Sequence, residues 1–119
     1  MSKPPLIAIV DDDDAVREAI RDLLQVEGLA ARTFESGTAF LSAAEHFDCL
    51  VTDVRMPDLD GIEIQRRLRA GGSAMPVIFV TSSADENTRV RALQGGAVAW
   101  FAKPLTDATF LAAIRAVLR

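Results

Sequence analysis

The sequence predicts an α/β fold built on a doubly wound parallel sheet. Strand-like runs alternate five times with segments whose apolar residues recur at helical spacing, and four of these runs are almost wholly apolar. Such runs are typical of parallel strands that helices bury on both faces. Right-handed β-α-β crossovers then place helices on both sides of the sheet.

The alternation defines each element in order. The predicted strands cover residues 6–10, 30–34, 48–53, 77–81 and 98–102. The predicted helices cover residues 14–27, a short segment after Ser36 with Phe40, Leu41 and Ala44, then 61–70, 85–94, and a last helix from Thr106 onward. The helix at 85–94 carries few apolar residues, so we expect it to be the most weakly packed and the easiest to move.

Length and composition bound the class of protein. A chain of 119 residues predicts one domain, residues 1–119, with a sizeable core. No apolar run approaches the ~20 residues that cross a bilayer, and the first five residues lack the apolar core of a signal peptide. The single cysteine, Cys49, cannot form an internal disulfide. We therefore expect a cytoplasmic protein without a membrane segment.

The charge is concentrated at one place. The net charge is 13 − 17 = −4, and the four consecutive aspartates Asp11 to Asp14 equal that excess. An acidic chain without a strong basic cluster argues against direct nucleic-acid binding. The densest basic stretch, residues 66–69, is expected to be the solvated face of a helix.

Four apolar runs each end in a polar residue that can do chemistry. Asp11 and Asp12 follow the first predicted strand, and Asp53 ends the third. Thr81 ends the fourth predicted strand, and Lys103 follows the fifth. Because the carboxyl ends of parallel strands line the ligand crevice of such sheets, we expect these side chains to gather at one edge. The combination predicts a site for a divalent cation and a phosphoryl group.

The carboxylates favour a metal. Several negative groups at one crevice repel one another unless a cation lies among them, and Mg²⁺ prefers oxygen ligands. The alternative is that the aspartates cap the following helix, whose dipole favours negative charge. One cap needs one aspartate, and Asp14 is expected to provide it. Asp11 and Asp12 are therefore predicted to bind Mg²⁺, with Mn²⁺ as the expected substitute.

Asp53 is the candidate nucleophile. A carboxylate can attack phosphorus to form an acyl phosphate, and the catalytic demand is mainly positioning and neutralisation of charge. Lys103 offers one positive charge, and Thr81 offers a hydroxyl donor to a phosphoryl oxygen. Each of the two alone would be an ordinary strand or surface residue, but together they favour phosphoryl chemistry.

The ordered motifs resemble the response-regulator receiver domain of two-component signalling. The segments that carry the resemblance are Ile9-Val10-Asp11-Asp12, Asp53 with Met56-Pro57-Asp58-Leu59-Asp60-Gly61, Val80-Thr81-Ser82, and Lys103-Pro104. The resemblance covers essentially the whole chain and is strongest to receivers of LuxR-type and nitrogen-fixation-type transcription regulators. It implies a flavodoxin-like (CheY-like) sheet of five strands in the order 2-1-3-4-5.

The resemblance also implies roles for individual residues. Asp53 would be the phosphoacceptor in a phosphorelay. Asp11, Asp12 and Asp53, with the main-chain carbonyl of Arg55, would hold Mg²⁺.

Three further residues would form the switch. Thr81 would donate a hydrogen bond to the phosphoryl group, and Lys103 would pair with it. Trp100 lies where the family usually carries an aromatic residue that changes rotamer on phosphorylation. Tyrosine and phenylalanine are commoner at that place, so simple packing of Trp100 on the last strand is the alternative.

The implied partners are a sensor histidine kinase and an output domain or downstream protein, with transcriptional output expected. A phosphorylation-dependent homodimer is a further expectation. The domain would not be an enzyme on other molecules, since it would catalyse only its own phosphorylation and dephosphorylation.

Two alternatives stay open at the level of sequence. A haloacid-dehalogenase-like phosphatase also uses an aspartate after its first strand, but its Asp-x-Asp-x-Thr/Val pattern would place Asp14 or Ala15 where a hydroxyl is needed. It would also leave Asp53 without a purpose. A receiver-like interaction module that is never phosphorylated would be expected to lack an acid or the lysine, and this chain lacks neither.

Overall fold

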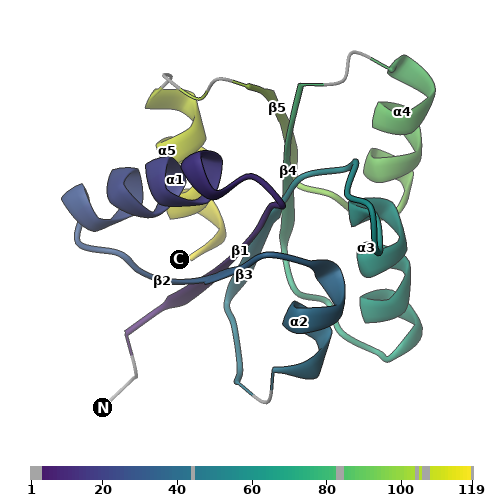
Figure 1. Ribbon diagram of the computed structural model, residues 1–119, viewed down its shortest axis with the longest axis horizontal. Coiled ribbons are helices and arrows are strands. Elements are labelled where there is room, and N and C mark those ends of the chain that lie inside the picture. Colours follow the sequence, from purple (N-terminus) through teal and green to yellow (C-terminus); the bar gives the residue numbers. More distant parts are fainter. Residues whose placement is uncertain (1–3, 44, 83–84, 104, 106–107, 119) are drawn as a thin grey trace.

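A five-stranded parallel sheet forms the centre of the molecule (Figure 1). The computed structural model describes residues 4–43, 45–82, 85–103, 105 and 108–118. The strands are β1 (Leu6–Val10), β2 (Ala30–Phe34), β3 (Cys49–Thr52), β4 (Val77–Thr81) and β5 (Ala99–Ala102), and the helices are α1 (Asp14–Val26), α2 (Gly37–Ser42), α3 (Gly61–Ala70), α4 (Glu86–Gln94) and α5 (Ala108–Val117). The strand order is β2-β1-β3-β4-β5, which confirms the predicted fold and topology.

Helices bury both faces of the sheet. Helices α1 and α5 cover one face, and α2, α3 and α4 cover the other (Figure 1). Strand β1 alternates between the two cores: Ile7 and Ile9 pack with α1 and α5, whereas Ala8 and Val10 pack toward the opposite side. Both sides of the strand are therefore apolar, which explains why the run shows no polar alternation. Within the described residues, no helix has both the length and the apolar character to cross a bilayer.

The start of α1 corrects one prediction. Asp13, not Asp14, caps this helix, because its Oδ1 accepts hydrogen bonds from the main-chain N–H of Ala15 at 2.9 Å and of Val16 at 3.3 Å. The N-cap is the last extended residue before the helix, and Asp13 has φ −96° whereas Asp14 is already helical. Asp11 and Asp12 still lie outside the cap.

The other boundaries agree with the prediction to within a residue or two where they are described. Ser36 caps α2 as expected, through a hydrogen bond from the N–H of Ala39 at 3.1 Å. The predicted positions of Ala44, Pro104 and Thr106 lie outside the described residues.

Hydrogen bonds between strand ends align the polar residues at one edge. The N–H of Asp53 donates to the carbonyl of Val10 at 3.1 Å, which places the end of β3 beside the end of β1. The N–H of Lys103 donates to the carbonyl of Thr81 at 3.0 Å, which aligns the ends of β5 and β4. The register of the sheet thus positions the site.

Helix α4 is the least buried helix, as predicted. Ala92 is its single buried residue among those described, whereas every other helix buries at least two. Val90 and Leu93 of α4 remain 40% and 39% exposed. Little apolar burial therefore holds α4 on the sheet, which makes it the helix best able to shift.

The basic stretch on α3 divides into two kinds of arginine. Arg66 and Arg67 pair with Glu63 on the exposed face, as the prediction of a solvated face requires. The prediction is wrong for Arg69, whose Nε donates to the carbonyl of Gly95 at 3.1 Å. A helix turns by about 100° per residue, so position 69 lies on a different face of α3 from positions 66 and 67, and this face is toward α4.

Glu63 gives a pH-dependent contribution to stability. Hydrogen bonds from Arg66, and then from Arg67, lower the pKa of Glu63 from 4.5 to about 2. A lowered pKa contributes stability that is present above pH 4.5 and is lost as the pH falls toward 2. We expect the urea midpoint of Glu63→Gln to lie slightly below that of the wild type at pH 7, and the two midpoints to converge as the pH falls. A gap that stays constant with pH would contradict this explanation.

Candidate functional site

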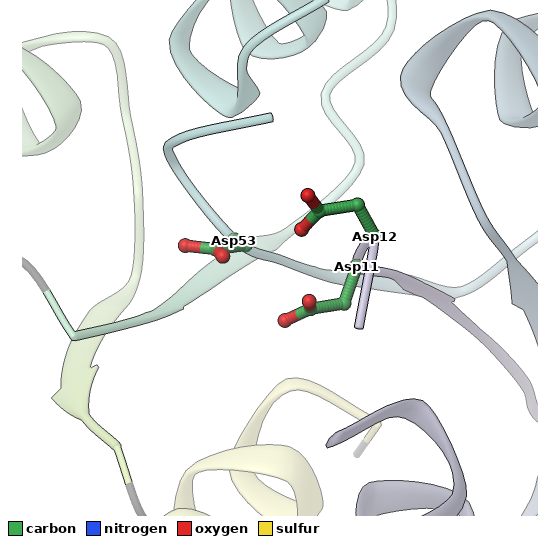
Figure 2. Close-up of side chains that lie close together, drawn as sticks. All are labelled: Asp11, Asp12 and Asp53. Atoms are coloured by element: carbon green, nitrogen blue, oxygen red, sulfur yellow. The ribbon is translucent and has the colours of Figure 1, made fainter. Parts of the chain in front are cut away.

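Three carboxylates meet at the carboxyl ends of β1 and β3. Figure 2 shows the side chains of Asp11, Asp12 and Asp53 lying close together. One oxygen from each lies within 4.8 Å of the others. Asp11 and Asp53 are buried, whereas Asp12 is exposed to solvent. The structure therefore brings together the three acids that the sequence placed after two different strands.

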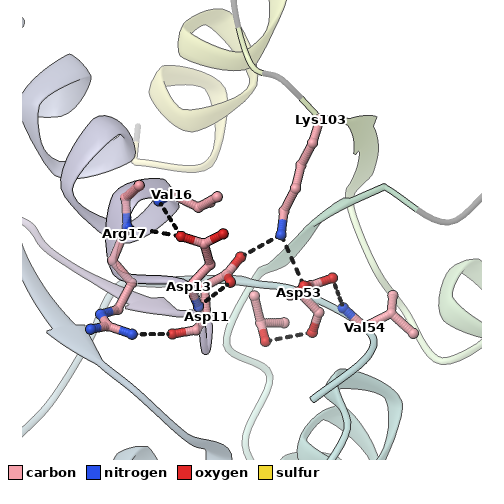
Figure 3. Close-up of polar contacts among 9 residues, drawn as sticks. Asp11, Asp13, Val16, Arg17, Asp53, Val54 and Lys103 are labelled. Carbon is pink, nitrogen blue, oxygen red and sulfur yellow. Dashed lines mark hydrogen bonds and ion pairs between the residues drawn. The ribbon is translucent and has the colours of Figure 1, made fainter.

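Lys103 joins this cluster from the end of β5. Its ammonium Nζ lies 2.7 Å from Oδ2 of Asp11 and 2.9 Å from Oδ2 of Asp53 (Figure 3). The side chain of Lys103 is only 16% exposed. One ammonium thus bridges two buried carboxylates, and the three acids together keep an excess of negative charge.

The backbone around Asp53 fixes its carboxylate. Its Oδ1 accepts a hydrogen bond from the N–H of Val54 at 2.7 Å (Figure 3), and its carbonyl accepts one from the hydroxyl of Thr52 at 2.9 Å. The first residue of α3, Gly61, packs so closely that a Cβ there would lie 2.3 Å from the carbonyl oxygen of Asp53. Asp53 is therefore held from the strand, the following loop and the next helix.

Burial and ion pairing act in opposite directions on the buried pair. Burial raises the pKa of Asp11, and the hydrogen bonds from Lys103 and from the N–H of Asp13 only partly offset this effect. Burial alone would lower the pKa of Lys103, but its bonds to Asp11 and Asp53 outweigh burial, so the pKa is raised. Lys103 is thus firmly cationic, while Asp11 is a carboxylate that a further positive charge would stabilise.

Two contributors to the site were missed from the sequence. Arg17 of α1 donates from Nη1 to the carbonyl of Asp11 at 2.6 Å, and the N–H of Asp13 donates to Oδ1 of Asp11 at 2.9 Å. The position of Arg17, one turn into the helix that follows the acidic run, could have suggested a contact with that run. Both contacts turn the loop after β1 so that Asp11 points into the cluster.

The remaining predicted site residues, Thr81, Trp100 and Arg55, each lie in different surroundings. Thr81 is buried at the end of β4, next to β3. The ring of Trp100 lies 5.7 Å from that of Phe79 and packs against the core beneath α2, α3 and α4. The side chain of Arg55 is 71% exposed, and its guanidinium lies 3.9 Å from a carboxylate oxygen of Asp85.

The donor set suits a hard divalent cation. The cluster offers carboxylate oxygens from Asp11, Asp12 and Asp53 and neither a nitrogen nor a sulfur ligand from the described residues. Such a set is typical of Mg²⁺, Mn²⁺ or Ca²⁺ rather than of zinc or copper. The acidic cluster is therefore compatible with a divalent metal.

A doubly wound parallel sheet with an acidic cluster and a lysine at the carboxyl ends of its strands is an α/β domain with a site suited to a metal and an anionic group. Comparison with known proteins identifies the family. The family model of the response regulator receiver domain matches residues 7–115. The chain therefore belongs to the response-regulator receiver domain family of two-component systems.

Three relatives illustrate the similarity. The chain is 44% identical over 114 residues to the transcriptional regulatory protein FixJ of Azorhizobium caulinodans, covering 94% of this chain and 54% of that protein. It is 40% identical over 116 residues to the response regulator protein TmoT of Ectopseudomonas mendocina, covering 96% of this chain and 53% of that protein. The crystal structure of FixJ-N superposes with a TM-score of 0.87 and 34% identity, covering 98% of this chain and 94% of that one.

These comparisons support a receiver and not a haloacid-dehalogenase-like phosphatase. Response regulators work with histidine kinases and output domains, and the curated relatives include a transcriptional regulator. This chain spans about half the length of those relatives, since it covers 53% of TmoT and 54% of FixJ.

Proposed function

We propose that Asp53 accepts a phosphoryl group from a sensor histidine kinase and that the domain then switches a transcriptional output. The observation that carries this proposal is the bridged cluster: Lys103 lies within 2.9 Å of two buried carboxylates, beside a third that is exposed. The two carboxylate oxygens of Asp53 have different donors: the N–H of Val54 bonds Oδ1, and the ammonium of Lys103 bonds Oδ2. A phosphoryl group at Asp53 would thus arrive beside a positive charge.

The transfer follows from ordinary acyl-phosphate chemistry. A carboxylate oxygen of Asp53 attacks phosphorus, the bond from phosphorus to the donor atom breaks, and the donor leaves with the electron pair. Lys103 can exchange part of its contact with Asp53 for a phosphoryl oxygen, and the hydroxyl of Thr81 can donate to another. Later attack of water on phosphorus returns inorganic phosphate and the free carboxylate of Asp53. We propose no catalysis beyond these two reactions.

A bound cation would supply the missing positive charge. We propose Mg²⁺, with Mn²⁺ as a substitute, held by the carboxylates of Asp11, Asp12 and Asp53 and by the main-chain carbonyl of Arg55. When bound, Mg²⁺ would neutralise charge on the transferring phosphoryl oxygens. The raised pKa of Asp11 supports this assignment, because a buried carboxylate short of positive charge favours a cation.

The energy of a few hydrogen bonds suffices for the switch. Phosphorylation adds roughly −1.5 to −2 charges, and turning a 1:99 population into 99:1 requires about 5.5 kcal/mol. Each hydrogen bond to a charged group contributes about 1.5–3 kcal/mol, so three bonds, from Thr81, Lys103 and a loop amide, supply roughly 4.5–9 kcal/mol, a range that includes the required value. The weakly buried α4 is the element expected to respond, with Trp100 as a candidate reporter.

An apolar hollow beside Lys103 supports docking of the kinase. It measures about 460 Å³ and is lined by Ala15, Ala19 and Leu23 of α1 with Leu105, next to the aliphatic part of Lys103. A kinase helix that packs there would bring its phosphohistidine to the edge of the sheet that carries Asp53. The exposed Val90, Leu93 and Val98 of the α4–β5 region offer a separate surface for a phosphorylation-dependent homodimer.

Intact mass after incubation with acetyl phosphate tests the proposal. We expect the wild type to gain one phosphoryl group with Mg²⁺ present and far less without it, and Asp53→Asn to gain none. If the wild type gained no phosphoryl group from acetyl phosphate or from a phosphorylated kinase, the proposal would be wrong. The chain would then be a receiver-like interaction module that is never phosphorylated.

Metal binding has its own test in the thermal midpoint. We expect MgCl₂ to raise the midpoint of the wild type, because a ligand that binds only the folded state stabilises it. Asp12 is exposed, so Asp12→Asn should fold normally and lose most of this shift. The matched control is Asp14→Asn, which removes the same charge two residues away and outside the cluster. A Mg²⁺ shift of the same size in Asp12→Asn and Asp14→Asn would contradict the proposed ligand set.

A further inference from the structure

The turn between β1 and α1 carries two carboxylates of the acidic cluster, and its main chain is buried at Asp11. This residue is 1% exposed, so its carbonyl oxygen needs a donor from the protein. Nη1 of Arg17 is such a donor, at 2.6 Å (Figure 3). Without Arg17 this buried oxygen would lose that hydrogen bond, and the turn would have to rearrange to satisfy it.

Arg17 reaches back from α1 and joins both ends of this turn. Its side chain is 14% exposed, and its Nη2 pairs with Asp14, the first residue of α1. The planar fork of a guanidinium can serve two such acceptors at once. The carboxylate of Asp14 is 84% exposed, and exposed ion pairs contribute little. The buried bond to the carbonyl of Asp11 is therefore the contact that holds the turn.

Two basic residues contact the acidic cluster, and they bond to different kinds of atom. Lys103 pairs with carboxylate oxygens of Asp11 and Asp53. Arg17 donates to a main-chain carbonyl and leaves the carboxylate of Asp11 available to a metal. The same turn also orients that carboxylate, because the N–H of Asp13 donates to Oδ1 of Asp11 at 2.9 Å. A fixed main chain thus fixes where the acids of the turn point.

We propose that Arg17 is a positioning residue that holds the carboxylates of Asp11 and Asp12 at a spacing suited to Mg²⁺ and too narrow for Ca²⁺. Mg²⁺ demands a near-ideal octahedron with ligands at about 2.0–2.1 Å, whereas Ca²⁺ takes ligands at about 2.3–2.6 Å in flexible geometries. A turn held by a buried, charge-assisted hydrogen bond cannot spread around the larger ion without losing that bond. The inference rests on the proposed ligand set.

The charge of Arg17, taken alone, predicts the opposite result. Removal of a cation beside an anionic site strengthens the binding of any other cation, and it does so equally for Mg²⁺ and Ca²⁺ because the two ions carry the same charge. A positioning role predicts weaker binding of Mg²⁺ and a smaller loss for Ca²⁺. The sign of the change and the ratio of the two affinities therefore separate positioning from electrostatics.

Titration with MgCl₂ or CaCl₂ alone, followed through the amide shift of Val54 and without any phosphodonor, tests the proposal. We expect Arg17→Met to raise the dissociation constant of Mg²⁺ about tenfold, as loss of one charge-assisted hydrogen bond gives. The constant for Ca²⁺ should rise by no more than about threefold. Arg17→Lys keeps the charge but not the fork of donors, so it should give an intermediate loss. It carries the same test if the methionine variant fails to fold.

The matched control is Arg21→Met, which removes the same charge one turn further along α1. It should leave the ratio of the two dissociation constants as in the wild type. Mg²⁺ binding that is unchanged or tighter in Arg17→Met would overturn the proposal. Equal losses for Mg²⁺ and Ca²⁺, or equal effects of Arg17→Met and Arg21→Met, would overturn it as well.

Amide order parameters measured without metal test the hold on the turn directly. In the wild type we expect Asp12 and Asp13 to show the value of a rigid backbone, about 0.85, and Arg17→Met to lower it. Unchanged order parameters in Arg17→Met would overturn the positioning role. If the wild type bound neither ion, the proposed metal ligands would be wrong, and the selectivity would fall with them. Binding lost in Asp12→Asn but unchanged in Arg17→Met would overturn the role of Arg17 alone.

Discussion

Gly61→Ala is expected to lower the free energy of unfolding by about 3 kcal/mol, the upper end of the usual cost of a forced steric clash in a packed interior. The new Cβ would lie 2.3 Å from the carbonyl oxygen of Asp53 and 2.9 Å from a ring carbon of Phe79. The backbone cannot simply withdraw, because the N–H of Gly61 donates to the carbonyl of Val54 at 2.8 Å. Relief of the clash must therefore move the end of β3 or the start of α3.

Urea unfolding at neutral pH measures this effect, and the chain offers a matched control. Gly71 ends α3 with an ordinary φ of −82°, and a Cβ there would meet its nearest neighbour at 3.4 Å. We expect Gly71→Ala to change stability by less than about 1 kcal/mol. If the unfolding curves of Gly61→Ala coincided with those of Gly71→Ala, the close approach of Gly61 to Asp53 would not limit the residue at position 61, which would contradict the prediction.

Lys103→Met is expected to have the second largest effect on stability, and the size of this effect should depend on Mg²⁺. Without the ammonium, the carboxylates of Asp11 and Asp53 face each other in a buried place. Loss of one partner of a buried ion pair costs about 3–5 kcal/mol, and the partial exposure of Lys103 reduces the expected loss to about 1–3 kcal/mol. Because the ammonium pairs with Asp11 and Asp53, two of the three proposed metal ligands, its removal should also strengthen Mg²⁺ binding.

Thermal midpoints with and without MgCl₂ separate these two consequences. We expect Lys103→Met to be less stable than the wild type without Mg²⁺ and to gain more than the wild type when Mg²⁺ is added. Arg89→Met, which removes an exposed positive charge from α4, should show the Mg²⁺ shift of the wild type. A smaller Mg²⁺ shift in Lys103→Met than in Arg89→Met would mean that Lys103 helps to bind the metal and does not compete with it.

The element order and the location of the site could be predicted because both depend on local patterns. Runs such as Val77 to Val80 are apolar on both faces, and only a strand covered by helices on both sides explains them. The polar residue at the end of each run then marks the edge of the sheet where Asp53 and Lys103 meet. The tertiary structure adds the distances between these residues and leaves the predicted location of the site unchanged.

The cap of α1 could not be assigned with the same certainty. Asp11 to Asp14 are four residues of one type, and each has a side chain able to cap a helix. The choice of Asp13 depends on where the chain turns after β1, and that turn is set by contacts of Asp11 with Arg17 and with the N–H of Asp13. No local pattern contains this information.

The junction between α3 and α4 was also beyond the sequence. Arg66, Arg67 and Arg69 are identical side chains within four positions, yet the first two pair with Glu63 whereas Arg69 bonds to the end of α4. Its role depends on how α3 and α4 lie against each other, which the crossing of the two helices decides. Gln65 is buried and donates from Nε2 to the carbonyl of Ala92 at 3.0 Å. It gave no signal in the sequence, because a glutamine on a helix is ordinarily exposed.

The most direct test of the central claim is to locate the phosphoryl group on the chain. Borohydride reduces an aspartyl phosphate to homoserine, so treatment after incubation with acetyl phosphate and MgCl₂, followed by peptide mass analysis, marks the residue that was modified. We predict homoserine at position 53 alone. Homoserine at position 11 or 12, or a modified chain in which Asp53 remains intact, would contradict the assignment of Asp53 as the phosphoacceptor.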